Sequence, residues 1–150
     1  MELSEVLDKN IVCLDLDADD KDDALRKMSA MLKKEGYIKD VDDFVKDIYF
    51  RESEGITGIG NGVAIPHGKS DSVCRIGIAI ALLKHPIAWE SLDNNPVDLI
   101  FLFCVSGDKN FAQNHMRMLS RVAGRIADDD LLKEIKESTT SERVVALMAG

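Results

Sequence analysis

The sequence predicts one α/β domain, residues 1–150, with a mixed, mainly parallel β-sheet flanked by helices on both faces. Segments with the composition of strands alternate with segments of helical period, and no tandem repeat or low-complexity tract lies between them. The run 97–105 is apolar at nearly every position, which is typical of a central strand covered on both faces. The connection between this run and the strand-like run 76–83 is too short for a crossover helix, which favours a mixed sheet.

The first part of the chain predicts a short strand and two helices. Residues 11–16 have the composition of a strand, and the acidic residues around and after its end supply several candidate N-caps for a helix. This helix runs to about residue 35, because apolar residues recur at helical spacing and Gly36 stands where a left-handed C-cap is favoured. A second helix is predicted over 41–53, again with aspartates in its first turn.

The second part predicts two strands and three further helices. The strands are the runs 76–83 and 97–105, joined by a turn-like segment. From about residue 110 the period is helical again, and shorter helices are predicted around 131–136 and 141–148. The segment 57–71, which lies before the first of these strands, is rich in glycine and predicts a flexible loop.

The composition excludes several classes of protein. The formal charge is −8, with 27 acidic against 19 basic residues, so we expect no nucleic-acid partner. The N-terminus lacks the pattern of a signal peptide, and no apolar run reaches the roughly 18 residues of a membrane helix. We therefore expect a cytoplasmic protein that does not insert into a membrane. Cys13, Cys74 and Cys104 are expected to be free, mostly buried thiols.

The stretch TGIGNGVAIPHGKSD, residues 57–71, has the most unusual local chemistry in the chain. Gly58, Gly60 and Gly62 alternate with larger residues, a spacing that permits positive φ and lets backbone N–H groups approach an anion. The stretch fits neither the GxxxxGK[ST] of a nucleotide-binding loop nor the GxGxxG of a dinucleotide-binding fold. The spacing is therefore only a candidate backbone anion site, and it matches no nucleotide-binding motif.

His67 is the candidate reactive group of this stretch. Pro66 fixes its own φ and favours extended geometry before it, while Gly68 leaves space beside the ring, so the imidazole is aimed and accessible. Much of an imidazole is unprotonated near neutral pH, and one ring nitrogen can accept a phosphoryl group while a hydrogen bond holds the other. The residues alone leave a second interpretation open, which is a surface histidine in a turn.

Two further residues could complete a cationic pocket. His115 lies on the apolar stripe of the helix predicted from residue 110, and Arg51 lies near the end of the helix over 41–53. A buried core histidine and a solvated cation are the alternatives, and the spacing does not show that either residue meets His67. No metal site is predicted, because HxxxH, HExxH and local clusters of ligands are absent. His85 is expected in an exposed turn and is assigned no role.

These residues resemble a known protein family. Arg51 and Glu52, followed by TGIGNGVAIPHGK over 57–69, resemble the active-site signature of enzyme IIA of the fructose and mannitol class in the bacterial sugar phosphotransferase system. Trp89, the segments 92–93 and 96–97, the strand 98–105 and the helix carrying His115 are similar to the rest of that domain. The resemblance covers residues 3–149, and the motif is long enough to be specific.

The resemblance implies a phosphotransferase that works as a phosphocarrier, with no metal or other cofactor. In this family the histidine matching His67 takes a phosphoryl group from the phosphohistidine of the carrier HPr. It passes the group to a cysteine of enzyme IIB, which drives uptake of a fructose-like sugar with the membrane enzyme IIC. The residues matching His115 and Arg51 lie beside the phosphorylated ring and hold or neutralise the phosphoryl group.

The implied reaction also suggests phosphate ligands. Phosphoryl transfer requires in-line positioning and stabilisation of charge on the equatorial oxygens, which backbone amides and a cation can supply. We therefore expect Asn61, Gly62 and Gly68 to bind phosphate through the backbone, together with the cation of Arg51. The docking face around His67 is expected to be apolar at its centre, with the acidic charge mostly outside it.

The family also has a branch that serves nitrogen and potassium regulation. In that branch the position matching Asn61 is often a histidine, so Asn61 here resembles the sugar branch. A nitrogen-regulatory enzyme IIA, acting as a phosphorylation-dependent binding module, is the alternative function.

Overall fold

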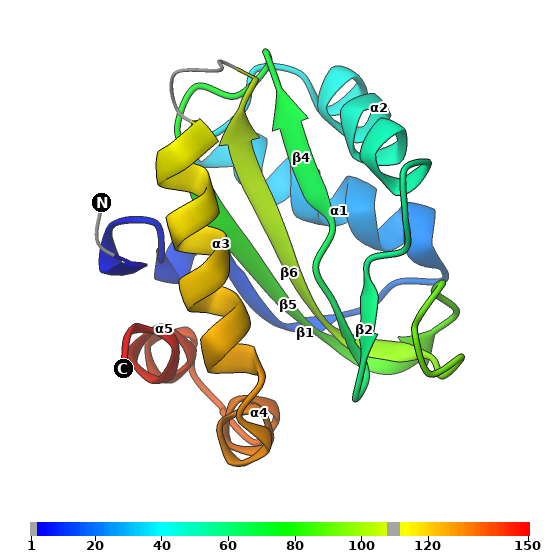
Figure 1. Cartoon of the computed structure of the whole chain (residues 1–150), viewed down its shortest axis with the longest axis vertical. Helices are drawn as coiled ribbons and strands as arrows, with labels where there is room; N and C mark the ends of the chain where they lie inside the picture. The colour runs from blue at the N-terminus through cyan, green and yellow to red at the C-terminus, as the bar shows by residue number, and fades with distance from the viewer. Residues whose placement is uncertain (1–2, 108–111) are drawn as a thin grey trace.

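A mixed sheet of six strands runs through the part of the chain that the structure describes, with helices on both of its faces (Figure 1). This computed structural model describes residues 3–107 and 112–150, apart from the side chains of residues 112–115 and 119. The strands are β1 (Val12–Leu16), β2 (Gly58–Gly60), β3 (Val63–Ala64), β4 (His67–Ser70), β5 (Gly77–Ile87) and β6 (Val97–Ser106). The helices are α1 (Lys21–Lys34), α2 (Val41–Glu52), α3 (Ala112–Ile126), α4 (Asp129–Lys136) and α5 (Ser141–Ala149), with 3₁₀ turns at Leu3–Glu5 and Lys9–Ile11.

The strand pairing confirms the predicted fold class. The order is β1-β5-β6-β3-β2, and β4 pairs with β6 further along the edge that β3 also uses. The pairs β1–β5, β3–β6 and β4–β6 are parallel, whereas β5–β6 and β2–β3 are antiparallel. The short connection between β5 and β6 therefore gives the antiparallel step that the sequence indicates.

Strand β6 is buried on both faces, as predicted for the run 97–105, and so are residues 77–82 of β5. Successive side chains of a strand point to opposite faces, so the residues of β6 divide between two apolar clusters. One cluster joins Leu99, Phe101, Phe103 and Val105 to α3, α4 and α5. The other joins Ile100, Leu102 and Cys104 to α1 and α2. The sheet thus separates two layers of helices. One helix of each layer extends toward the top edge of the sheet (Figure 1).

The first two helices begin at aspartate caps, as the acidic segments predict. Asp20 accepts a hydrogen bond from the backbone N–H of Asp23 at 2.8 Å, and Asp40 accepts one from Asp43 at 2.9 Å. Gly36 follows the end of α1 with a φ of 82°, the left-handed geometry expected there. None of the described helices combines the length and apolarity needed to span a membrane.

The prediction of a flexible loop over 57–71 is wrong for much of that segment, which forms β2, β3 and β4. Gly60, Asn61 and Gly62 have φ of 93°, 57° and 76°, and they turn the chain between β2 and β3. The rest is extended because β6 offers an edge with which β3 and β4 can pair. That partner lies far away in the sequence, so the local pattern does not reveal it.

Strand β5 is longer than predicted. It extends to Ile87, so His85 lies exposed in a strand and not in a turn. The pairing of β5 with β6 shifts register between Leu82 and Ile87, where Pro86 has no N–H to give to the ladder.

The three cysteines are free, as predicted. Cys104 is buried and Cys13 is half-buried, but Cys74 is exposed, so the expectation of mostly buried thiols is wrong for Cys74. Burial in the apolar layer raises the pKa of the Cys104 thiol to about 12, which makes it an inert core residue.

Candidate functional site

His67 is the first residue of β4, directly after a break in the sheet edge. β3 and β4 both pair with β6 and are separated by Ile65 and Pro66. Pro66 has no N–H for the ladder, but its carbonyl accepts a hydrogen bond from the N–H of Phe103 at 2.9 Å. The N–H of Ile65 donates to the carbonyl of Thr57 at 2.9 Å. The break therefore has a fixed geometry, and it directs the His67 side chain toward the face of the sheet that α3 covers.

The imidazole of His67 is half-buried and packs on an aromatic ring. Its centroid lies 5.1 Å from that of Phe103, with a tilt of 38° between the two planes. Nδ1 is buried and has no hydrogen-bond partner among the described residues. Burial lowers the pKa of His67, and the positive charge of Arg51 lowers it further. The backbone of Ile65 opposes this pKa shift, although it does not reach hydrogen-bond geometry with Nδ1.

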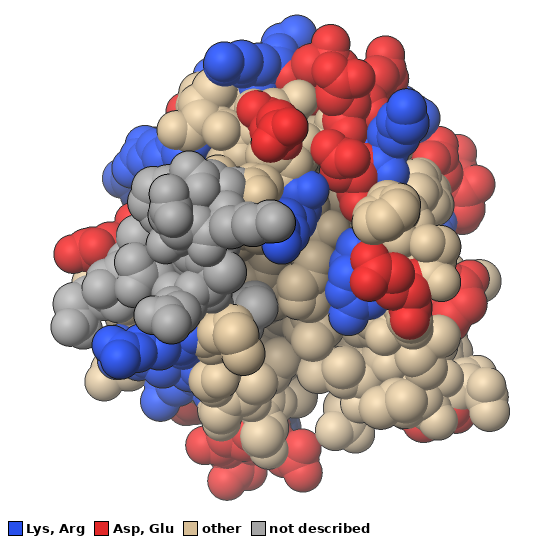
Figure 2. All heavy atoms as spheres, turned by 45° about the horizontal axis from the view of Figure 1, so that its top comes forward, with Lys and Arg blue, Asp and Glu red and all other residues tan. Residues whose placement is uncertain are grey.

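A cavity of about 640 Å³ opens beside His67, between α2, β4 and α3. Figure 2 shows Lys and Arg side chains beside a central hollow with uncharged residues between them. The described residues that line it are Asp47, Phe50, Arg51, Glu54, His67, Lys69, Ser70, Asp71, Val105, Gly107 and Met116. Residues from the helical layers on both faces of the sheet, and from the edge strand between them, thus line the cavity.

Two cations stand at this cavity with His67. The guanidinium of Arg51 leaves the last turn of α2, and its Nη1 donates to the carbonyl of Gly55 at 3.3 Å. Lys69 follows His67 by two residues in β4, so both side chains lie on the same face of the strand. Lys69 was not among the predicted site residues, because a segment expected to be a loop has no faces to assign.

The rim of the cavity is more acidic than predicted. Phe50 and Met116 are 69% and 68% exposed, which matches the apolar surface expected for a docking face. Asp47, Glu54 and Asp71 nevertheless line the same cavity, so the expectation that the acidic charge lies mostly outside it is wrong for these three. Around His67 the surface therefore presents both signs of charge beside exposed apolar side chains.

The structure does not bring Asn61 and Gly62 to His67. Val63 pairs with Leu99 and His67 with Phe103, so the β2–β3 turn lies several residues further along β6, at roughly 3.3 Å per residue. There the N–H of Asn61 donates to Asp93 Oδ2 at 3.2 Å, and its carbonyl accepts from Lys136 Nζ at 2.9 Å. The turn residues are engaged with α4 and the β5–β6 connection, which corrects their expected role at the phosphate.

Gly68 is close to His67, but its missing side chain serves packing. A Cβ on Gly68 would lie 2.1 Å from Cζ of Phe44, the fully buried ring that α2 places against β4. The space that the sequence assigned to the ring of His67 is therefore filled by Phe44 on the opposite face. His115, the last predicted site residue, lies in α3 with a side chain outside the described ones.

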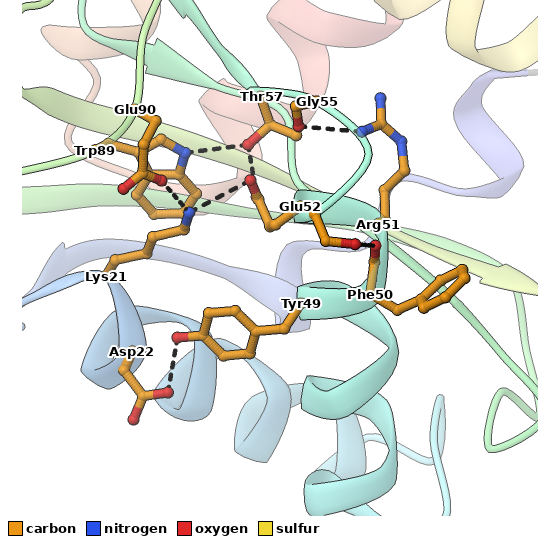
Figure 3. Close-up of polar contacts among 11 residues, drawn as sticks. Lys21, Asp22, Tyr49, Phe50, Arg51, Glu52, Gly55, Thr57, Trp89 and Glu90 are labelled. Carbon is orange, nitrogen blue, oxygen red and sulfur yellow. Dashed lines mark hydrogen bonds and ion pairs between the residues drawn. The ribbon is translucent and has the colours of Figure 1, made fainter.

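A polar network with a buried centre at Thr57 and Glu52 lies beside Arg51 (Figure 3). Thr57 donates from Oγ1 to Glu52 Oε1 at 2.6 Å and accepts from Trp89 Nε1 at 3.0 Å. Lys21 pairs with the other oxygen of Glu52 at 3.3 Å and with Glu90 at 2.6 Å. The sequence carries no local signal for this network, because its members come from α1, α2, the segment before β2 and the β5–β6 connection. Among the described residues, no group of His, Cys, Asp and Glu could hold a metal ion.

The lowered pKa of His67 predicts a titration midpoint below the usual 6.5. Replacing Arg51 with Gln removes one of the two causes, so the midpoint should rise while staying below 6.5, since burial is the larger cause. Histidine resonances followed by NMR against pH measure the midpoint of His67 in the unchanged chain and in Arg51→Gln. A midpoint at or above 6.5 in the unchanged chain would contradict the enclosure of the ring.

Comparisons with known proteins identify the family of the chain. Residues 5–150 match the family described as "Phosphoenolpyruvate-dependent sugar phosphotransferase system, EIIA 2". The chain is 30% identical over 149 residues to the 2-O-alpha-mannosyl-D-glycerate-specific EIIABC component of Escherichia coli (strain K12), covering 99% of this chain and 22% of that protein. It therefore spans less than a quarter of that relative's length.

Shorter relatives match over most of their length. The nitrogen regulatory protein of Klebsiella oxytoca is 33% identical over 150 residues, covering 99% of this chain and 90% of that protein. The crystal structure of the nitrogen regulatory protein IIA-Ntr from Neisseria meningitidis has a TM-score of 0.88 and 27% identity, covering 97% of this chain and 98% of that chain. With the match over residues 5–150, these similarities show that the chain belongs to the EIIA 2 family of the phosphoenolpyruvate-dependent sugar phosphotransferase system, whose members are phosphotransferase components that carry phosphoryl groups.

Proposed function

We propose that this chain is a cytoplasmic phosphocarrier for uptake of a fructose-like sugar. His67 accepts a phosphoryl group from the phosphohistidine of HPr and passes it to a cysteine of enzyme IIB, which acts with the membrane enzyme IIC. The observation that supports this proposal best is the setting of His67. Its ring is enclosed at Nδ1 and shares one cavity with the cations of Arg51 and Lys69.

The enclosed Nδ1 leaves Nε2 as the nitrogen that a partner can reach. In the first transfer the lone pair of Nε2 attacks phosphorus, and the new N–P bond forms as the N–P bond of the donor breaks. The donor nitrogen keeps that electron pair and takes up a proton. In the second transfer a cysteine thiolate attacks the same phosphorus, an S–P bond forms, and Nε2 recovers its electron pair.

Two properties of the cavity favour these steps. The lowered pKa of His67 keeps the ring unprotonated, and therefore nucleophilic, at neutral pH. Arg51 and Lys69 can stabilise the charge on the phosphoryl oxygens during transfer, which is the main demand that a loose transition state makes on a protein. We also propose that His115 helps to hold the phosphoryl group, as the family resemblance implies.

The test is phosphoryl transfer with purified components. Phosphoenolpyruvate, enzyme I and HPr should place one acid-labile phosphate on the chain, and ³¹P–¹⁵N NMR should find it on Nε2 of His67. Added enzyme IIB of a fructose-type system should then remove the label in a cysteine-dependent manner. A chain that stays unlabelled, or that is labelled on Nδ1, would contradict the proposal.

A nitrogen-regulatory role is the second candidate, favoured by the 90% coverage of the Klebsiella oxytoca relative and by the 0.88 TM-score. In that role the phosphorylated and unphosphorylated forms bind a regulated protein with different affinity. Transfer of the label to enzyme IIB favours the sugar relay. A labelled chain that gives up no phosphate to any enzyme IIB, but captures a kinase or transporter in only one phosphorylation state, favours regulation.

A further inference from the structure

We propose that Thr57 and Glu52 form a positioning pair that couples the segment holding Arg51 to the strand that begins at His67. This inference rests on the proposed function and deepens it. Neither side chain is among the residues that line the cavity, so they act through other residues and do not touch the phosphoryl group.

Thr57 connects the two sides of the site through different atoms. Its hydroxyl donates a hydrogen bond to Glu52 and accepts one from Trp89 (Figure 3). Its main-chain carbonyl accepts the N–H of Ile65, two residues before His67. Thr57 is 2% exposed, so water cannot replace these partners. A shift of Thr57 therefore moves the chain that enters β4.

Glu52 anchors the other side of the site. Its side chain is 8% exposed, with one carboxylate oxygen on Thr57 and the other on Lys21. A buried carboxylate is costly unless it is paired and hydrogen-bonded. The Glu52 carboxylate therefore holds its two partners, Thr57 and Lys21, in place. Glu52 directly follows Arg51 in the last turn of α2, where neighbouring residues point in different directions. Glu52 is thus held in the interior while Arg51 extends to the cavity.

The segment between the two residues carries the anchor of Arg51. The hydrogen bond from Thr57 to Glu52 closes this segment, and within it the carbonyl of Gly55 accepts from Arg51 Nη1. Ile56 is 48% exposed, so the segment has little apolar packing of its own. Its conformation, and with it the place of the guanidinium, depends on the Thr57–Glu52 bond.

The test compares three single substitutions. Thr57→Val keeps the shape of the side chain and removes the hydroxyl, whereas Thr57→Ser keeps the hydroxyl. Ser29→Ala is the matched control, because it removes another fully buried hydroxyl, one that donates to Leu25 within α1. Each variant is assayed for phosphoryl acceptance from phospho-HPr, with the rate normalised to the folded fraction.

We expect Thr57→Val to lower kcat by about ten- to a hundredfold, because small displacements of reacting groups have effects of that size, with KM within about twofold. Thr57→Ser should restore most of kcat, and Ser29→Ala should leave it unchanged. The NMR resonances of the His67 ring should also move in Thr57→Val without any partner present, and return in Thr57→Ser. An unchanged kcat, a change in KM alone, or an equal loss in Ser29→Ala would overturn the positioning role.

The ring resonances separate this inference from the proposed function. If the unchanged chain accepts no phosphate, the proposed function fails. The coupling is then tested by whether the His67 ring resonances move in Thr57→Val. Unchanged resonances would overturn the coupling without any measurement of phosphoryl transfer.

Discussion

His67→Ala is expected to carry no acid-labile phosphate under conditions that label the unchanged chain fully. Removal of the nucleophile stops covalent catalysis, so acceptance from phospho-HPr should fall by at least about 10³-fold. Arg51 and Lys69, the two cations that line the cavity, cannot replace the imidazole as acceptor. The measurement is radiolabel retained after gel filtration, with acid lability as the signature of a phosphohistidine.

His115→Ala is the matched histidine control. It should still become labelled, but it should pass its phosphate on slowly, because the acceptor remains while a proposed stabiliser of the phosphoryl group is lost. Circular dichroism checks that both variants are folded. Label on His67→Ala together with an unlabelled His115→Ala would reverse the two roles.

Gly68→Ala is expected to destabilise the fold by more than an ordinary surface substitution. The added Cβ would lie 2.1 Å and 2.3 Å from two ring atoms of Phe44, whose side chain is fully buried. Overpacking of this kind costs about 1–3 kcal/mol, occasionally more. The free energy of unfolding measured in urea reports the loss. Slower phosphoryl acceptance by the folded fraction is also expected, because α2 carries both Phe44 and Arg51.

Gly124→Ala is the control for this substitution. Gly124 lies in α3, and apart from its own helix backbone and chain neighbours nothing lies within 4 Å of an added Cβ, so alanine should be neutral or should stabilise by about 0.5–1 kcal/mol. Phe44→Leu combined with Gly68→Ala should lose less stability than the sum of the two single substitutions, since the smaller side chain relieves the overlap. Equal stability of Gly68→Ala and the unchanged chain would contradict the packing role.

The features that depend on residues close together in the sequence are predicted well, namely the helix caps and the burial of β6. Asp20 and Asp40 cap helices because their side chains reach N–H groups three residues ahead, and the apolar run of β6 indicates burial on both faces without knowledge of its neighbours. The predicted helix limits therefore differ from the observed ones by only a few residues.

The parts that could not be predicted depend on distant partners. β3 and β4 are strands only because β6 accepts them, so a glycine-rich segment was predicted as a loop. The role of Gly68 depends on Phe44 in another element. His67 and Arg51 could be named as candidates, but their interaction is a property of the folded chain. Asn61 was expected at the phosphate because the glycine spacing favours backbone N–H groups as anion ligands, but the fold places this turn away from His67.

The strand that carries His67 is paired on one side only, since β4 has no neighbour except β6 among the described residues. Short edge segments open locally at a lower free energy than central strands, which open only with the whole domain. The cooperative unit of this fold is thus centred on β5 and β6, and the reactive residue stands at its margin. Local opening of β4 should therefore leave the unfolding equilibrium of the core nearly unchanged.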